Sequence, residues 1–198
     1  MVQIPSLSLE IPNSITLQVN QEQFEILAQV NNDLKLERTA TGELIVTPPT
    51  GGETGKRNLI ISTQLGNWVE THLHLGEGFD SSTGFVLPNG AYRSPDAAWI
   101  SKQRWESLTE AQRRGFVPLC PDFVIELRSQ SDSLSKLQAK MTEYISNGTR
   151  LGWLINPQER LVEIYRFNQA VARLDNPSQL SGEDVLPGFI LSLTRIIN

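Results

Sequence analysis

Residues 121–157 read PDFVIELRSQSDSLSKLQAKMTEYISNGTRLGWLINP, and the hydrophobic pattern of this stretch decides the fold. It predicts a buried strand, a short polar turn, an amphipathic helix, a glycine-containing stop and a second buried strand. The apolar residues of the helix share one face, which consists of Leu134, Leu137, Met141, Tyr144 and Ile145. A helix between two buried strands is typical of a sheet that is covered by helices.

Further strands and helices are predicted on both sides of this unit. Residues 34–49, LKLERTATGELIVTPP, indicate a hairpin around Thr41-Gly42. A longer helix follows, from the glycine-rich bend at residue 50 to about residue 72. Residues 78–101 favour strands, residues 103–115 a short polar helix, and residues 160–198 closing strands. We therefore expect an α/β fold with a mixed central sheet flanked by helices.

Composition and charge narrow the class of protein. The chain has 198 residues, of which 39% are hydrophobic and 20% charged, as in ordinary globular domains. It contains no apolar run long enough to span a membrane, so no membrane partner is expected. A single cysteine, Cys120, favours a reducing cytoplasm. The net charge of -5 argues against coating of nucleic acid by bulk attraction, but it leaves room for a local groove.

The first predicted strand of the 121–157 unit carries charged residues on one face. Asp122, Val124, Glu126 and Arg128 alternate with apolar residues that face the core. Burial of an acid and an arginine costs several kcal/mol unless they are paired or bound to metal. Either Glu126 and Arg128 form a salt bridge on an exposed face, or Glu126 joins Asp96, of an earlier Ser-Pro-Asp, in holding a divalent metal.

Lysines on the following helix bear on this choice. Lys140 lies about 80° from the centre of the apolar stripe, where its stem can follow the core and its ammonium can reach a carboxylate or a phosphate. The alternative is a surface pair with Glu143, three residues on. Lys136 lies further out, and we expect it to be solvated.

Several motifs in fixed order now support a resemblance. The segment SPDAAWISKQRW, residues 94–105, and the 121–157 unit resemble the Uma family of restriction-endonuclease-like proteins. The shared order is Pro-Asp, then Pro-Asp-x-x-x-Glu, then Lys-x-x-x-Tyr, then Gly-Trp-Leu-x-x-Pro. The similarity covers roughly residues 30–195. It implies the fold of type II restriction enzymes over residues 31–198, with residues 1–30 as an N-terminal arm and a short helix packed on that domain.

The resemblance also implies roles for particular residues. In that fold two acids hold the metal, and these are Asp96 and Glu126 here, with the carbonyl of Leu127 as a candidate third ligand. The lysine that usually follows the second acid by two positions is replaced by Arg128, which could contact phosphate but cannot act as a base. Lys140 resembles a relocated lysine that reaches the site from the helix.

A helix before the core strands often supplies another acid in this fold. The resemblance points to Glu53, and with less support to Glu43. A charge at a helix N-terminus, favoured by the helix dipole, explains Glu53 equally well. Asp122 is more than about 13 Å along the strand from Glu126 and is expected to be a structural acid.

The function implied is Mg²⁺- or Mn²⁺-dependent hydrolysis of phosphodiester bonds, with DNA as the substrate and a homodimer as the assembly. Two other readings stay open. One is a non-catalytic nucleic-acid-binding or structural protein that keeps the fold, favoured by Arg128 and by the acidic net charge. The other is an interaction module in which the charged cluster is only an ion-pair network.

Overall fold

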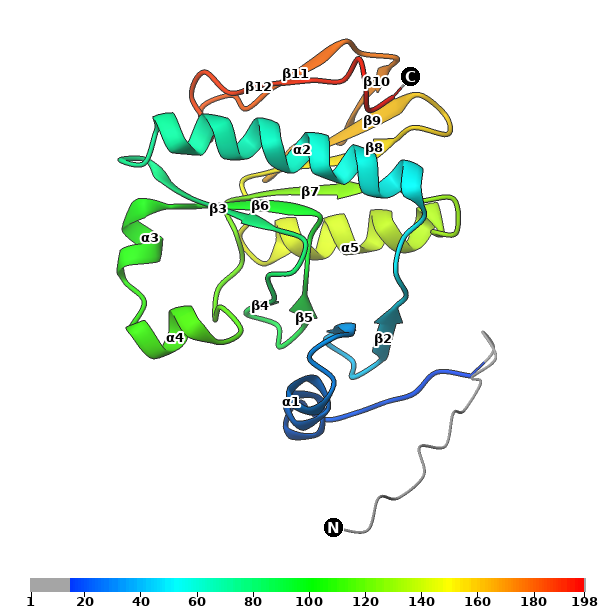
Figure 1. Cartoon of the computed structure of the whole chain (residues 1–198), viewed down its shortest axis with the longest axis vertical. Helices are drawn as coiled ribbons and strands as arrows, with labels where there is room; N and C mark the ends of the chain where they lie inside the picture. The colour runs from blue at the N-terminus through cyan, green and yellow to red at the C-terminus, as the bar shows by residue number, and fades with distance from the viewer. Residues whose placement is uncertain (1–14, 198) are drawn as a thin grey trace.

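A six-stranded mixed sheet forms the centre of the molecule, as the computed structural model shows for residues 15–197 (Figure 1). The strand order is β10-β9-β8-β7-β6-β3. β7 and β8 are parallel, and the other pairs in this sheet are antiparallel. The strands are β3 (Gly76–Asp80), β6 (Ala97–Ser101), β7 (Phe123–Leu127), β8 (Leu151–Asn156), β9 (Leu161–Arg166) and β10 (Ala172–Asp175). The expected α/β fold with a mixed central sheet is confirmed.

The unit β7-α5-β8 follows the predicted strand–helix–strand pattern. α5 (Leu134–Ser146) is the crossover that two parallel strands require. On β7, Phe123, Ile125 and Leu127 pack into the core on one face of the sheet. Val124 packs on the opposite face, which α5 covers. Glu126 shares the face of Val124 by alternation. The strand therefore delivers an acid to the side of the sheet that α5 covers.

Two helices cover the two faces of the sheet (Figure 1). α2 (Gly52–Thr71) buries Ile61, Leu65, Trp68 and Val69 against one face. α5 buries Met141 and Tyr144 against the other. Gly152 of β8 lets α5 lie close, because a Cβ at this position would be 2.5 Å from Met141 Cε. None of the helices of the described chain is long and apolar enough to cross a membrane.

A second, four-stranded sheet lies beside α5, in the order β2-β1-β5-β4 (Figure 1). Its strands are β1 (Lys35–Arg38), β2 (Leu44–Thr47), β4 (Phe85–Val86) and β5 (Tyr92–Arg93). β1 and β2 form the hairpin that the sequence predicts, and its turn contains Gly42 at a φ of 97°. This sheet matters for the site because β1 and β5 each contribute a charged side chain to it.

The N-terminal helix packs on the second sheet. α1 (Gln21–Val30) begins at Asn20, whose side chain forms a capping box with Gln23. Phe24 is fully buried, with its ring centroid 4.5 Å from that of Tyr92. Residues 1–14 of the expected arm lie outside the described residues.

The remaining elements close the two layers. The polar helix expected at residues 103–115 is interrupted: it consists of α3 (Lys102–Glu106) and α4 (Glu110–Arg114), because Thr109 forms a capping box that starts a new helix. β11 (Gln179–Ser181) and β12 (Ile190–Ser192) form a hairpin on the α2 side of the large sheet. Apolar residues of this segment, such as Phe189 and Leu191, complete the core there.

Candidate active site

Asp96 and Glu126 meet at one end of the large sheet. β6 and β7 are antiparallel neighbours in which Ala97 faces Ile125, so Asp96, just before β6, lies across from Glu126. The backbone holds Asp96 in place: its N–H donates to the carbonyl of Ile125 at 3.0 Å. Its carboxylate Oδ2 accepts a hydrogen bond of 2.8 Å from the N–H of Leu127. The structure thus brings together the two acids and the backbone of the residue that the sequence analysis grouped as metal ligands.

Lys140 reaches the same place from α5. Its Nζ lies 2.7 Å from Glu126 Oε1 and 2.8 Å from Oε1 of a further acid, Glu37. Its side chain is only 12% exposed, as expected for a lysine at the border of the apolar stripe. Glu143 pairs with Arg93 at 2.6 Å rather than with Lys140. The surface-pair alternative for Lys140 is therefore not what the structure shows.

Glu37 belongs to this cluster and was missed in the sequence analysis. It lies on β1, is 4% exposed, and accepts a hydrogen bond of 2.9 Å from the N–H of Ser94 and one of 3.2 Å from Arg93. The only signal in the sequence is an acid inside an alternating apolar hairpin. Such a pattern puts the side chains of Glu37 and Leu36 on opposite faces of the strand, but it does not show what either face contacts. The packing of the second sheet against α5 decides that.

The two buried glutamates differ electrostatically. Burial alone would raise the pKa of Glu37, but the charges of Lys140 and Arg93 hold it below its ordinary value. Burial raises the pKa of Glu126 to about 7; Lys140 opposes the rise, and the negative charges of Asp96 and Glu37 add to it. Nearby positive charges therefore compensate the negative charge of Glu37, whereas those around Glu126 do not offset the cost of burying its carboxylate.

The hydroxyl and the ammonium around Glu126 keep their protons. Burial raises the pKa of Tyr144 well above its ordinary value, and its hydroxyl donates to Glu126 Oε1 at 3.1 Å. Burial would lower the pKa of Lys140, but the adjacent Glu126 and Glu37 raise it above the ordinary value. Lys140 is therefore a charged donor at neutral pH.

The donor set fits a hard divalent cation in part. Asp96 and Glu126 offer carboxylate oxygens, which Mg²⁺ and Mn²⁺ prefer. Within residues 15–197, no hydrogen bond or ion pair reaches Glu126 Oε2, and Asp96 Oδ1 has only long contacts, to Lys35 Nζ at 3.8 Å and Asn58 Nδ2 at 3.4 Å. No three His, Cys, Asp or Glu side chains of the described chain converge as metal ligands. A third ligand would have to be an amide, a backbone carbonyl or water.

Arg128 lies beside the cluster without joining it. Its guanidinium contacts Glu159 at 3.0 Å, Asn156 Oδ1 at 3.4 Å and the carbonyl of Asp132 at 3.3 Å. The alternative pairing of Glu126 with Arg128 is not observed, since each has a different partner. The Arg128 side chain remains 17% exposed, at the rim of the sheet end.

The other acids named in the sequence analysis lie elsewhere. Glu53 is exposed in the first turn of α2 and pairs with Lys56 and Arg57. Its hydrogen bond from Lys56 lowers its pKa. Glu43 lies in the hairpin, where its backbone bridges to Gln18. The structure brings neither into contact with Asp96 or Glu126.

Asp122 has the structural surroundings expected of it. Its Oδ2 accepts a hydrogen bond of 2.8 Å from the N–H of Ser101, and its Oδ1 pairs with Arg104 at 3.0 Å. The carboxylate thereby joins the end of β6 to α3. Nearby, burial raises the pKa of the Cys120 thiol to about 11, so this cysteine is an unreactive core residue.

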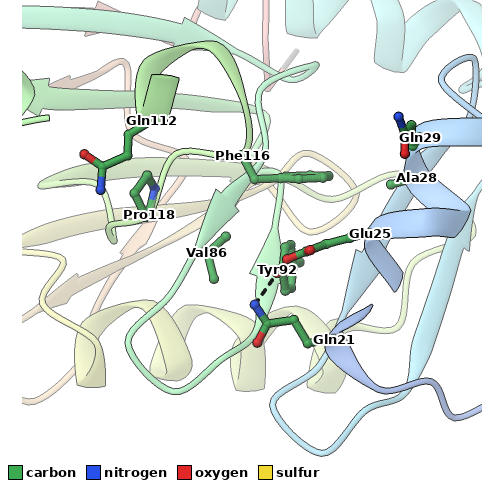
Figure 2. Close-up of a pocket in the computed structure, with 9 residues that line it drawn as sticks. All are labelled: Gln21, Glu25, Ala28, Gln29, Val86, Tyr92, Gln112, Phe116 and Pro118. Atoms are coloured by element: carbon green, nitrogen blue, oxygen red, sulfur yellow. Dashed lines mark hydrogen bonds between the residues drawn. The ribbon is translucent and has the colours of Figure 1, made fainter. Parts of the chain in front are cut away.

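A hollow of about 590 Å³ lies away from the acids, between α1, the second sheet and the segment after α4 (Figure 2). Figure 2 shows Glu25 and Tyr92 pointing toward each other inside it, and the Tyr92 hydroxyl donates to Glu25. Tyr92 and Arg93 are neighbours on β5 and point to opposite sides of it. The hollow is therefore separated from the charged cluster by the second sheet.

Comparison with known proteins agrees with this arrangement. Residues 21–194 match the profile of the Uma2 family, which is described as "Putative restriction endonuclease". A crystal structure of "a putative nuclease belonging to DUF820" from Anabaena variabilis has the same fold, with a TM-score of 0.69 and 21% sequence identity. The match covers 82% of this chain and 89% of that one. No curated protein matches the chain.

The family profile spans most of the chain, and the matched residues include the whole charged cluster from Glu37 to Tyr144. The resemblance found in the motifs is thereby confirmed, and the chain belongs to the Uma2 family of restriction-endonuclease-type nucleases.

Proposed function

We propose that the protein is a Mg²⁺- or Mn²⁺-dependent endonuclease that hydrolyses phosphodiester bonds in DNA. The observation that carries the proposal is the contact of Lys140 with buried Glu126, next to Asp96, at one end of the sheet. Two acids and a lysine at a strand end are the inventory that metal-assisted hydrolysis of a phosphodiester needs.

The electrostatics of Glu126 favour a cation site over an ion-pair network. In a network that only stabilises the fold, each charge would be compensated, as that of Glu37 is. Glu126 instead has a raised pKa, because burial and two neighbouring acids outweigh the single lysine. A perturbed carboxylate of this kind is typical of functional sites.

Asp96 and Glu126 would hold the cation, with the carbonyl of Leu127 as a further candidate ligand. The cation would polarise the phosphate and lower the pKa of a bound water. Lys140 stays protonated, so it does not take a proton from water; it donates hydrogen bonds to the phosphate or to the attacking water and stabilises developing negative charge. Arg128, at the rim, would exchange exposed Glu159 for a backbone phosphate.

A homodimer is part of the proposal, since two active sites in one assembly can cut both strands of a duplex together. Large apolar side chains are exposed on α1 and on β2, a terminal strand of the second sheet: Ile26, Val30 and Val46. Exposed apolar side chains of this kind favour contact with a second copy. Light scattering of the purified protein would show twice the monomer mass. The Val30→Glu variant would show a mass closer to that of the monomer.

The experiment that tests the activity uses supercoiled plasmid with Mg²⁺, Mn²⁺ or EDTA. We expect wild-type protein to nick or linearise it with either metal and not in EDTA. Asp96→Asn, Glu126→Gln and Lys140→Met should each lose at least about 100-fold in rate. Lys136→Met, a change of an exposed lysine on the same helix, should cleave like wild type. Equal cleavage by Glu126→Gln and wild type would refute the site.

One observation favours a second function, a non-catalytic nucleic-acid-binding protein that keeps the fold. Lys140 already contacts two carboxylates, and an arginine stands at the place of the usual lysine. This reading predicts retention of DNA without cleavage, and retention that Arg128→Ala weakens in EDTA as well as in Mn²⁺. Metal-dependent cleavage by wild type would exclude it.

A further inference from the structure

Asn58 of α2 carries a buried oxygen without a partner. Its Nδ2 donates to Asp96 Oδ1 at 3.4 Å, whereas its Oδ1 is buried and takes no hydrogen bond in the described structure. The orientation of the amide is chemically sensible, because the nitrogen faces the carboxylate. Yet a buried carbonyl oxygen that lacks a donor is costly, and native structures rarely keep one without a reason.

An oxygen at the place where the Asn58 amide meets Asp96 would supply what the cation site lacks. Asp96 and Glu126 supply two carboxylates, and the next acid, Glu37, is occupied by Lys140 and Arg93. No third acid, cysteine or histidine of residues 15–197 completes a ligand set. An amide oxygen is a suitable hard ligand for Mg²⁺ or Mn²⁺.

We propose that Asn58 is a ligand of the divalent cation and binds it through Oδ1 when the side-chain amide turns over. The inference rests on the proposed function, because it needs a cation at Asp96. A half-turn about the last side-chain bond exchanges Nδ2 and Oδ1, which are nearly equal in size. Oδ1 then lies where Nδ2 lies now, 3.4 Å from Asp96 Oδ1. Adjacent ligands of an octahedral Mg²⁺ are about 3 Å apart, so a small adjustment suffices.

The surroundings of Asp96 are consistent with such a switch. Oδ1 of the Asp96 carboxylate is approached by two donors, the Asn58 amide and the Lys35 ammonium, at 3.4 and 3.8 Å. Both distances are long for strong contacts, and the Lys35 side chain is 29% exposed, so it can leave. α2 thus contributes an oxygen at the place where the sequence analysis expected an acid from the preceding helix, but from Asn58 and not from Glu53.

Mn²⁺ binding to the full chain, without nucleic acid, tests the inference. Electron paramagnetic resonance of free Mn²⁺ would be followed for wild type, Asn58→Ala, Asn58→Asp and Glu126→Gln. Asn67→Ala, at an exposed asparagine of the same helix, is the matched control. We expect Asn58→Ala to weaken binding at least 10-fold, Asn58→Asp to bind as tightly as wild type or more tightly, and Asn67→Ala to be unchanged.

A role for Asn58 in folding alone would give a different result. Asn58→Ala would then change the melting temperature in EDTA and leave the affinity for Mn²⁺ as in wild type, which would overturn the inference while the proposed function stands. Weaker binding by folded Asn58→Asp than by wild type would also overturn it. Failure of wild type to bind Mn²⁺ more tightly than Glu126→Gln would refute the proposed function itself.

Discussion

At the scale of single residues, the site depends on one lysine placed between two buried glutamates. Lys140 forms ion pairs with both Glu37 and Glu126. Arg93 forms an ion pair with Glu37 but not with Glu126. Removal of one member of a buried charged group usually costs more than the group contributes, because the remaining charge stays buried and unpaired. If the proposed function holds, stability and activity depend on the same side chain.

Lys140→Met should destabilise the protein by about 3 kcal/mol at pH 8, because it leaves two buried carboxylates with too little positive charge. The loss should shrink toward pH 5, where Glu126 can take up a proton. Urea denaturation at both pH values measures it, with the exposed Lys136→Met as the control. A loss for Lys140→Met no greater than that for Lys136→Met would show that the contact has no energetic weight.

The raised pKa of Glu126 makes the stability of the folded protein depend on pH. The folded-state pKa of about 7 lies above the ordinary 4.5. The folded protein therefore holds a proton that the unfolded chain releases, and the stabilisation present below pH 4.5 is lost as the pH rises through 7. Glu126→Gln should not lose stability in this way, because glutamine does not ionise as the pH rises.

We therefore expect Glu126→Gln to match wild type near pH 4.5 and to exceed it in stability by about 1–3 kcal/mol above pH 7, in EDTA. Denaturant midpoints across this pH range would show the divergence. Parallel curves for the two proteins, or a variant that becomes less stable as the pH rises, would mean that Glu126 belongs to a compensated ion-pair network.

At the scale of elements, glycines set how closely the strands and helices pack. Gly76 begins β3 opposite Ser101 at the edge of the large sheet. A Cβ there would lie 2.1 Å from the carbonyl oxygen of Ile100 and 2.6 Å from the Trp99 ring. Backbone cannot give way as the end of a flexible side chain can.

Gly76→Ala should therefore destabilise the protein by about 1–3 kcal/mol, by forcing β3 away from β6. Gly66→Ala is the matched control, because a Cβ there meets nothing within 4 Å on α2. It should stabilise the protein by about 0.5–1 kcal/mol through helix propensity. Thermal melting of both variants tests the pair; a neutral Gly76→Ala would show that β3 can move outward at little cost.

At the scale of the whole molecule, the proposed cation would join parts of the chain that are far apart in sequence. Asp96 immediately precedes β6, Glu126 lies on β7, and Asn58 contacts Asp96 from α2. A ligand that binds the folded state alone stabilises all of it through mass action. Binding should thus be visible in global unfolding.

Mn²⁺ at about 100 times its Kd should stabilise wild type by about 2.7 kcal/mol, which is roughly a 5–10 °C rise in Tm for a chain of this size. Asp96→Asn should lose most of the rise, because a neutral amide replaces a carboxylate ligand. Calorimetry with Mn²⁺ and with EDTA measures both proteins. The same rise in the Asp96→Asn variant would place the bound cation elsewhere.

Local patterns in the sequence were sufficient for most elements and for part of the site. The 121–157 unit and the 34–49 hairpin were predicted because their periodicity depends on near neighbours in the chain. The border position of Lys140 on its helix followed from the same periodicity. The split of α3 from α4 was missed.

What the sequence determined by itself is therefore the set of elements, the alternation that places Glu126 on the face of its strand opposite Phe123, Ile125 and Leu127, and the family. What only the tertiary structure decided is which side chains surround the acids Asp96 and Glu126. Glu37 arrives from β1 and Asn58 from α2, and neither carries a periodic or motif signal. The physical reason is that burial, charge compensation and ligand geometry arise between segments dozens of residues apart, and the packing of the two sheets against α5 and α2 brings those segments together.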